Sequence, residues 1–147
     1  MNDIKGNTAL ITGGTKGIGY GVADMLLQKG VSVCITGRHS ETVKEAAEKL
    51  NKISDAKAIG VTADVRSYAD MENVINEMVS QFGRVDAVVA NAGLGHFGSI
   101  MDLTHEQFTQ TVDTNLTGVF NTIKPALNAL KDSKGYIITI ASLAGTN

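Results

Sequence analysis

The sequence predicts an α/β fold, in which helices cover both faces of a doubly wound parallel sheet. Five short apolar segments alternate with amphipathic segments along the chain, which is the pattern of such folds. The apolar segments lack apolar–polar alternation, so we expect their strands to be buried on both faces. Glycine is in excess, at 16 of 147 residues, and it clusters directly after the first apolar segment. We expect the strand order 3-2-1-4-5, with right-handed crossovers.

The predicted strands are short and mostly apolar. They are expected at Thr8–Ile11, Val31–Thr36, Ala58–Ala63, Val85–Ala90 and Tyr136–Ala141. The sequence ends at Asn147, soon after the fifth strand and without a helix to cover it. We therefore expect one domain over residues 1–147, truncated so that the sheet is incomplete at its carboxyl terminus.

The first two helices are predicted from apolar residues at helical spacing. Those of the first helix, which should end at Gly30, are Ile18, Val22, Met25 and Leu26. Those of the second are Val43, Ala46, Ala47 and Leu50. Ser40 precedes the second set at a distance that suits an N-cap, so we expect it to cap that helix.

The last two helices each begin with a capping-box pattern. Ser67 with Asp70 starts the third, which should end at Gly83, and its apolar face is Met71, Val74, Ile75, Met78 and Phe82. Thr104 with Gln107 starts the fourth, whose apolar face is Phe108, Val112, Leu116, Val119, Ile123 and Leu127. Pro125 lies inside this long helix and should bend or break it, because proline cannot donate a helical hydrogen bond.

Composition and charge exclude several classes of protein. Hydrophobic residues make up 43% of the chain and charged residues 19%, which is typical of a folded domain. We expect no membrane contact and no nucleic acid, because no apolar run is long enough to span a bilayer and the net charge is only −2. The single cysteine, Cys34, suggests a cytoplasmic protein. His39, His96 and His105 are scattered, so no metal site is expected.

The glycine cluster lies between the first strand and the first helix, in the segment Thr12-Gly13-Gly14-Thr15-Lys16-Gly17-Ile18-Gly19. Gly13 would allow a tight turn, Gly17 would let the backbone approach a pyrophosphate, and Gly19 would let the helix pack closely against the sheet. Phosphates would then lie at the helix N-terminus, where N–H groups and the helix dipole favour anions. The alternative is a glycine-rich turn that binds no ligand.

Three further motifs follow this loop. Asn91-Ala92-Gly93 closes the fourth strand, Asn115 lies in Asn-Leu-Thr-Gly-Val-Phe within the long helix, and Ser142 lies in Ile-Ala-Ser-Leu-Ala-Gly after the fifth strand. Together with the T-G-x-x-x-G-x-G spacing of the loop, these motifs resemble those of the classical short-chain dehydrogenase/reductases, in the same order. The resemblance covers the whole chain but only the N-terminal portion of the family's domain. It implies a dinucleotide-binding domain of the Rossmann type.

The resemblance also implies which residues bind a nicotinamide cofactor. They are Thr12, Gly13, Thr15, Lys16, Gly17, Ile18, Gly19, Arg38, Asp64, Val65, Asn91, Ala92 and Gly93. A carboxylate at the tip of the second strand would repel a ribose 2′-phosphate, but here that tip is Gly37. Arg38 follows with a guanidinium suited to phosphate, and Lys16 lies in the loop. We therefore expect NADP(H), with NAD(H) as the alternative if both cations are ordinary solvated side chains.

The remaining cofactor positions have roles by resemblance alone. Asp64 would accept a hydrogen bond from the adenine amine beside the Val65 N–H, or it would only brace the turn before Ser67. Asn91 would steady the central sheet and Gly93 would let the backbone approach the nicotinamide ribose. A simple turn is the alternative for these two.

Ser142 and Asn115 are the catalytic residues that the resemblance implies. The serine would hydrogen-bond the substrate carbonyl or hydroxyl, and the asparagine would hold a water in the proton relay. The family's proton donor is a Tyr-x-x-x-Lys pair, in which the lysine lowers the tyrosine pKa. Tyr20, Tyr68 and Tyr136 have no lysine four residues on, so we expect these 147 residues alone to be inactive.

Two functions of different classes follow. The first is an NADP(H)-dependent oxidoreductase acting on a ketone or secondary alcohol, including a 3-oxoacyl-carrier-protein reductase-like substrate, with Leu94–Ser99 at the substrate mouth. The second is a catalytically incompetent nucleotide-binding fragment or regulatory module. A methyltransferase fits poorly, because it has no use for the Asn115 and Ser142 pair. In similar proteins the helix over residues 107–131 packs against a following helix and across a dimer interface. We therefore expect an exposed second apolar side, which either drives self-association or marks truncation, and a homo-oligomer, either a dimer or a tetramer.

Overall fold

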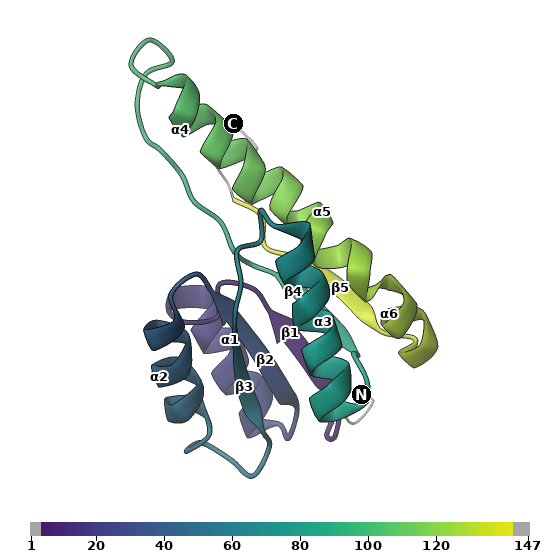
Figure 1. Ribbon diagram of the computed structural model, residues 1–147. Coiled ribbons are helices and arrows are strands. Elements are labelled where there is room, and N and C mark those ends of the chain that lie inside the picture. Colours follow the sequence, from purple (N-terminus) through teal and green to yellow (C-terminus); the bar gives the residue numbers. More distant parts are fainter. Residues whose placement is uncertain (1–3, 143–147) are drawn as a thin grey trace.

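The computed structural model describes residues 4–142. They form a parallel sheet in the order β3-β2-β1-β4-β5, which confirms the predicted topology (Figure 1). The strands are β1 (Thr8–Ile11), β2 (Ser32–Gly37), β3 (Ala58–Thr62), β4 (Ala87–Ala90) and β5 (Tyr136–Thr139). Because all strands point the same way, the loops that follow them gather at one edge of the sheet.

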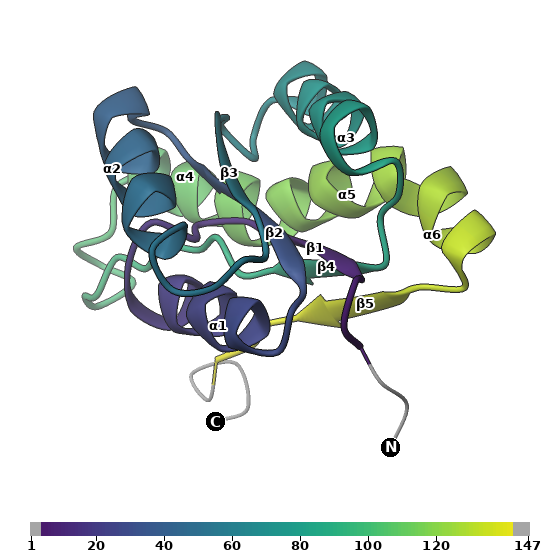
Figure 2. The ribbon, with the colours of Figure 1, turned by 90° about the horizontal axis from the view of Figure 1, so that it is seen from below.

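Helices lie on both faces of the sheet (Figure 2). The helices α1 (Gly17–Gln28) and α2 (Ser40–Leu50) cover one face, and α3 (Tyr68–Phe82) lies on the other. Beside α3 lies a long segment that consists of α4 (His105–Val112), a π-helical turn (Asp113–Thr117), α5 (Gly118–Ile123), a 3-10 turn (Lys124–Ala126) and α6 (Leu127–Ser133). The α4 end of this segment extends beyond the sheet (Figure 1).

Two apolar clusters, one on each face of the sheet, form the core. The first joins strand residues to α1 and α2, and it includes Ile11, Val33, Ile35, Ala23, Leu27 and Leu50. The second joins the strands to α3 and α6, and it includes Leu10, Cys34, Val88, Met71, Val74, Met78 and Leu130. Alternate residues of one strand therefore serve opposite faces, and β1 is buried on both of them as predicted. The same prediction is wrong for β5, whose four residues are all exposed because this strand lies at the edge of the described sheet.

The inward face of α1 differs from the prediction. Ile18 and Met25 were expected inside, yet they are 67% and 62% exposed. The buried residues are Gly19, Ala23 and Leu27, with Val22 and Leu26 only partly buried. Small residues let the helix axis come close to the sheet, and a search for large apolar side chains overlooks them.

The helix caps agree with the sequence at two of three positions. Thr104 and Gln107 form a complete capping box, and the Ser67 Oγ accepts a hydrogen bond from the Asp70 N–H at 3.2 Å. The prediction that Ser40 caps α2 is wrong. His39 has the extended backbone of the N-cap position and Ser40 is already helical, so the helix begins one residue earlier than the serine suggests.

The long segment is broken near Pro125, where the 3-10 turn interrupts it, as predicted. Its predicted apolar face, however, is largely exposed. Phe108, Leu116 and Leu127 of this face are 60%, 69% and 36% exposed. The buried side instead consists of small and polar residues with one leucine, namely Thr114, Gly118, Asn121, Thr122, Ala126 and Leu130. The exposed apolar side of the segment is therefore made largely by residues of the predicted apolar face, rather than by a second side.

A buried aspartate ties the amino-terminal edge of the sheet together. Asp86, just before β4, accepts a hydrogen bond from the Thr8 N–H of β1 at 2.8 Å. Arg84 donates to the same carboxylate from Nε at 3.0 Å and from Nη2 at 2.6 Å. The Asp86 side chain is only 7% exposed, so these donors offset the cost of burying its charge.

Candidate functional site

The loop after β1 turns sharply at glycines, and the residues packed against it leave no space for larger side chains at Gly14. Gly13 has φ of 65° and Gly17 has φ of 58°, in the left-handed region that favours glycine. The Gly14 N–H donates to the Thr36 oxygen of β2 at 3.1 Å. A Cβ on Gly14 would lie 2.7 Å from Cγ2 of Ile35, so this position also needs glycine. Sequence reasoning missed Gly14, although its place beside Gly13 in a glycine pair was a signal.

Asn91 joins the loop after β4 to the loop after β1. Its Nδ2 donates to the Thr12 oxygen at 2.9 Å and to the Gly13 oxygen at 3.3 Å. The hydroxyl of Thr12 accepts from the N–H groups of Asn91 and Ala92, both at 3.1 Å. A Cβ on Gly19 would lie 2.5 Å from Asn91 Nδ2 and 2.6 Å from the Gly13 oxygen. The absence of a side chain at Gly19 thus allows α1 to begin against both loops.

A cleft of about 530 Å³ opens at the carboxyl edge of the sheet. Thr12 and Gly19, which contact Asn91 of the wall, do not line it. The other residues of the expected cofactor set all line it, namely Gly13, Thr15, Lys16, Gly17, Ile18, Arg38, Asp64, Val65, Asn91, Ala92 and Gly93. Thr36, His39, Thr42 and Thr114 line it too, and no sequence motif singled them out as ligand contacts. Leu94, the first residue of the expected substrate mouth, also lines the cleft.

Two cations face this cleft, one from each of two loops. Lys16 lies directly before α1, and Arg38 follows the last residue of β2. Neither forms an ion pair with any residue in the range 4–142. A second cavity of about 600 Å³ between α1 and α2 adjoins the cleft and shares Lys16, His39 and Thr42 with it. This end of the cleft is therefore suited to an anionic group.

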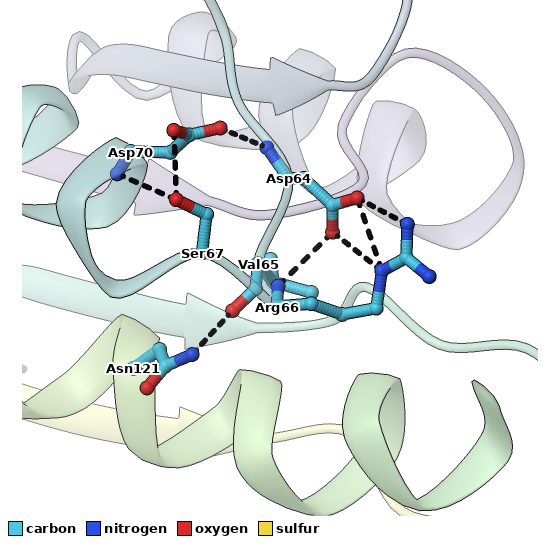
Figure 3. Close-up of polar contacts among 6 residues, drawn as sticks. All are labelled: Asp64, Val65, Arg66, Ser67, Asp70 and Asn121. Atoms are coloured by element: carbon cyan, nitrogen blue, oxygen red, sulfur yellow. Dashed lines mark hydrogen bonds and ion pairs between the residues drawn. The ribbon is translucent and has the colours of Figure 1, made fainter. Parts of the chain in front are cut away.

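Asp64 and Val65 follow β3, beside the end of β2, and form a further part of the cleft wall. The contacts of the turn hold them in place (Figure 3). The Asp64 N–H donates to Asp70 Oδ2 at 2.9 Å, and the Val65 oxygen accepts from Asn121 Nδ2 at 2.9 Å. Asp64 Oδ1 accepts from the Arg66 N–H and from Arg66 Nε, both at 3.0 Å. Hydrogen bonds from the Arg66 side chain, with the nearby charges of Arg66 and Arg38, hold the Asp64 pKa below 3.8.

Asn115 lies in the π-helical turn, and its side chain is bound to the loop after β4. Its Oδ1 accepts from the Leu94 N–H at 2.9 Å, and its Nδ2 donates to the Leu94 oxygen at 2.7 Å. A Cβ on Gly93 would lie 3.3 Å from Asn115 Oδ1. The side-chain amide thus positions the segment that leads into Leu94–Ser99, where Phe97 is 99% exposed.

Ser142 follows β5 at the same edge of the sheet. The Ile140 N–H donates to the Ala90 oxygen at 3.0 Å, which holds this segment beside the end of β4. Ser142 is exposed and does not line the cleft. The structure therefore brings most of the expected cofactor set together at one cleft, while neither of the two expected catalytic residues lines it.

The helices within residues 4–142 include none with the length and apolar character to cross a membrane. In the same residues, no three histidine, cysteine, aspartate or glutamate side chains gather in a way that could hold a metal ion.

Known proteins resemble this chain in sequence and in structure. The chain is 35% identical to a 3α-hydroxysteroid dehydrogenase of Mediterraneibacter gnavus, over 92% of this chain and 54% of that protein. It is 34% identical to a 3-oxoacyl-acyl-carrier-protein reductase of Staphylococcus epidermidis, over 94% of this chain and 57% of that protein. A solved actinorhodin polyketide ketoreductase variant with NADPH has a TM-score of 0.91 at 34% identity, covering 99% of this chain and 56% of that one.

The chain thus spans little more than half the length of the relatives it matches. The family model that describes short chain dehydrogenases matches residues 7–147. That range contains the glycine loop, the Asn91 turn, the π-helical Asn115 and Ser142. The chain therefore belongs to the short chain dehydrogenase family.

Proposed function

We propose that this chain forms the cofactor-binding part of an NADP(H)-dependent oxidoreductase that interconverts a ketone and a secondary alcohol. The observation that carries the proposal is the cleft at the carboxyl edge of the sheet, where loops after β1, β2, β3 and β4 converge. Ligands of open α/β sheets bind at this edge. When bound, the nicotinamide supplies or accepts the hydride.

The start of α1 fits a pyrophosphate. The first turn of the helix has no acidic residue, and no side chain caps it. Its N–H groups have no partner within the helix and point towards the cleft, where the helix dipole favours an anion. A Cβ on Gly17 would meet nothing within 4 Å, so the space beside this glycine is open for the phosphate groups.

The charges of the cleft favour NADP(H) over NAD(H). Lys16 and Arg38 would bind the ribose 2′-phosphate, and the tip of β2 is Gly37 rather than a carboxylate that would repel it. The Gly37 position also has close neighbours, since a Cβ there would lie 2.8 Å from Cγ2 of Thr15. The solved polyketide ketoreductase with NADPH is consistent with this preference.

Asp64 and Val65 would bind the adenine. The carboxylate would accept from the adenine amine, and the Val65 N–H, which has no hydrogen-bond partner among residues 4–142, would donate to the ring. Asn91 would hold the loop after β4 against the loop after β1. Gly93 would leave space for the nicotinamide ribose.

For the reaction itself, Ser142 would hydrogen-bond the substrate oxygen while hydride moves. Asn115, whose side-chain amide is bound to Leu94, would hold a water in the proton relay. The proton donor would come from a Tyr-x-x-x-Lys pair that these 147 residues do not contain. The names of the relatives are consistent with a carbonyl or secondary alcohol substrate, including a 3-oxoacyl group.

Assembly and location are part of the proposal. The exposed apolar side of the long segment, with Leu116 and Phe120 at 69% and 60% exposure, would pack against a second copy in a dimer or tetramer. The buried free thiol of Cys34 is compatible with the reducing cytoplasm.

A binding and turnover experiment tests the function. NADPH and NADH are titrated against the 147-residue chain by calorimetry, and NADPH oxidation is followed with a panel of ketones. We expect NADPH to bind more tightly than NADH, with no turnover. Added general acid catalysis typically contributes ~10²–10⁴-fold, so a longer natural form carrying Tyr-x-x-x-Lys should reduce ketones. Ser142→Ala in that form should lower kcat far more than cofactor affinity.

The second candidate function is a nucleotide-binding module without chemistry, because the cleft gathers the expected cofactor residues whereas neither Ser142 nor Asn115 lines it. It predicts cofactor binding with no ketone reduction by any natural form of the protein. Failure of the chain to bind either dinucleotide would contradict both candidates.

A further inference from the structure

We infer that Arg66 is a positioning residue for adenine recognition, because it fixes the Asp64 carboxylate in one orientation at the wall of the cleft. This inference rests on the proposed function and extends it to a residue that does not line the cleft. Asp64 and Val65 face the cavity, whereas Arg66 lies behind them, with 38% of its side chain exposed.

The backbone on both sides of the carboxylate is already fixed. The Asp64 N–H is bound by Asp70, whose other oxygen, Oδ1, accepts from the Ser67 hydroxyl at 2.8 Å (Figure 3). The Val65 oxygen is bound by Asn121 on α5, and a Cβ on Gly118 would lie 2.7 Å from Cγ2 of Val65. The turn is thus held between α3 and α5. The main freedom that remains is rotation of the Asp64 side chain.

Arg66 removes this freedom. Its Nε lies 3.0 Å from both carboxylate oxygens, its Nη2 lies 2.5 Å from Oδ2, and its backbone N–H donates to Oδ1 at 3.0 Å. A planar guanidinium that meets a carboxylate at several points sets the plane of the carboxylate, which a single point charge does not. Arg66 therefore determines which way the acceptor atoms of Asp64 point.

The three N–H groups of Arg66 do not occupy every acceptor position of the Asp64 carboxylate. An ionised carboxylate offers about four acceptor positions, and the Nε–H is shared between the two oxygens. One position is left for a further donor. An exocyclic amine such as that of adenine is a donor, whereas the oxo group at the same place in hypoxanthine is an acceptor and would face the negative charge. The arrangement therefore selects adenine over hypoxanthine.

The chain contains a matched control for this contact. Arg84 also pairs with an aspartate two positions away, donating from Nε and Nη2 to Asp86. That pair lies at the amino-terminal edge of the sheet, at the opposite end from the cleft. Arg84→Ala thus removes the same kind of ion pair without touching the adenine wall.

The test compares NADPH with its hypoxanthine analogue, in which an oxo group replaces the adenine amine. Dissociation constants of both are measured for the 147-residue wild type, Arg66→Ala, Arg66→Lys and Arg84→Ala. We expect the wild type to prefer the adenine form and Arg66→Ala to reduce this preference about tenfold. Arg66→Lys should restore part of it, because an ammonium pairs with Asp64 but cannot fix its plane. Arg84→Ala should keep the wild-type ratio.

A double-mutant cycle separates positioning from general stability. In Asp64→Asn, the further change Arg66→Ala should leave the adenine preference unaltered, because no carboxylate remains to be oriented.

An unchanged ratio of the two dissociation constants in Arg66→Ala, or an equal loss of affinity for both nucleotides, would overturn the inference and leave the proposed function intact. So would a wild type that binds both forms equally. Wild-type chain that binds neither would instead refute the proposed function. Should Arg66→Ala fail to fold, Arg66→Lys and the cycle in the Asp64→Asn background decide the matter.

Discussion

The side-chain amide of Asn91 donates to the backbone oxygen of Thr12 at 2.9 Å, so the turn after β4 supports the turn after β1 directly. The same amide nitrogen is within 3.3 Å of the Gly13 oxygen. Two loops that are far apart in the sequence therefore form one rigid floor for the cleft. Cofactor binding should depend on contacts within this floor as much as on groups that touch the ligand.

Arg38→Asp is expected to reverse the cofactor preference from NADPH to NADH. The substitution removes a phosphate-binding guanidinium and places a carboxylate where it can accept from ribose hydroxyls. A charge-assisted hydrogen bond contributes ~1.5–3 kcal/mol, so the affinity ratio should change ~10–150-fold. Titration of both cofactors against wild type and variant checks this. Equal affinities of the wild type for NADPH and NADH would contradict the assignment of NADP(H) and leave the fold untouched.

Gly19→Ala should destabilise the protein by about 1–3 kcal/mol, because the new methyl group overlaps Asn91 Nδ2 and the Gly13 oxygen. The loss should appear in thermal unfolding and also as weaker cofactor binding. Gly21→Ala is the control in the same helix. A Cβ there meets nothing within 4 Å, so replacing this glycine should stabilise α1 by ~0.5–1 kcal/mol. Equal effects of the two substitutions would rule out the close approach at Gly19.

Cys34 should resist thiol reagents in the folded protein. Burial raises the pKa of its thiol to about 12, with a smaller contribution from the negative charge of Glu77. Because the thiol stays neutral in the fold, its contribution to stability is complete below the ordinary pKa of 9.0 and is lost as the pH rises from there towards 12. Labelling at pH 8 in buffer and in denaturant checks the first point. Rapid labelling of the native protein would show that β2 opens readily.

The exposed apolar side of the long helical segment should drive self-association. Leu116→Glu combined with Phe120→Glu should shift the protein towards the monomer, since both side chains are largely exposed and the change removes apolar contact area. Light scattering of wild type and variant measures the shift. Val79→Glu, which changes an exposed apolar side chain of α3, is the control and should leave the oligomeric state unaltered. A wild type that stays monomeric at high concentration would refute this interface.

The sheet topology was predictable because its signals are local and repeated. Each strand is a short apolar run closed by glycine or a polar residue, and right-handed crossovers restrict how such runs can be ordered. The residues of the cleft were predictable for a related reason. The loops that carry most of them follow strands, and the carboxyl ends of parallel strands meet at one edge whatever the details of packing. The adenine and nicotinamide positions, such as Asp64 and Gly93, came from the family resemblance rather than from this geometry.

Other features escaped sequence reasoning for identifiable physical reasons. The buried faces of α1 and of the long segment rest on Gly19, Ala23, Gly118 and Asn121, and a search for large apolar side chains overlooks such residues. Arg66 stands in a charged stretch with no periodicity, so nothing in the sequence distinguishes its pairing with Asp64 from ordinary solvation. The role of Ile35 in excluding a side chain at Gly14 also depends on three-dimensional proximity alone.

The bond between Thr12 and Asn91 also has a consequence for synthesis. The two residues are 79 positions apart, and a ribosome that adds ~5–20 residues per second needs ~4–16 s to make that stretch. Until then the glycine loop emerges without its support, and β1 lacks its neighbour β4. The nascent chain can therefore gain a complete nucleotide pocket only after β4 has left the exit tunnel. Cofactor capture by stalled chains of increasing length would reveal that moment.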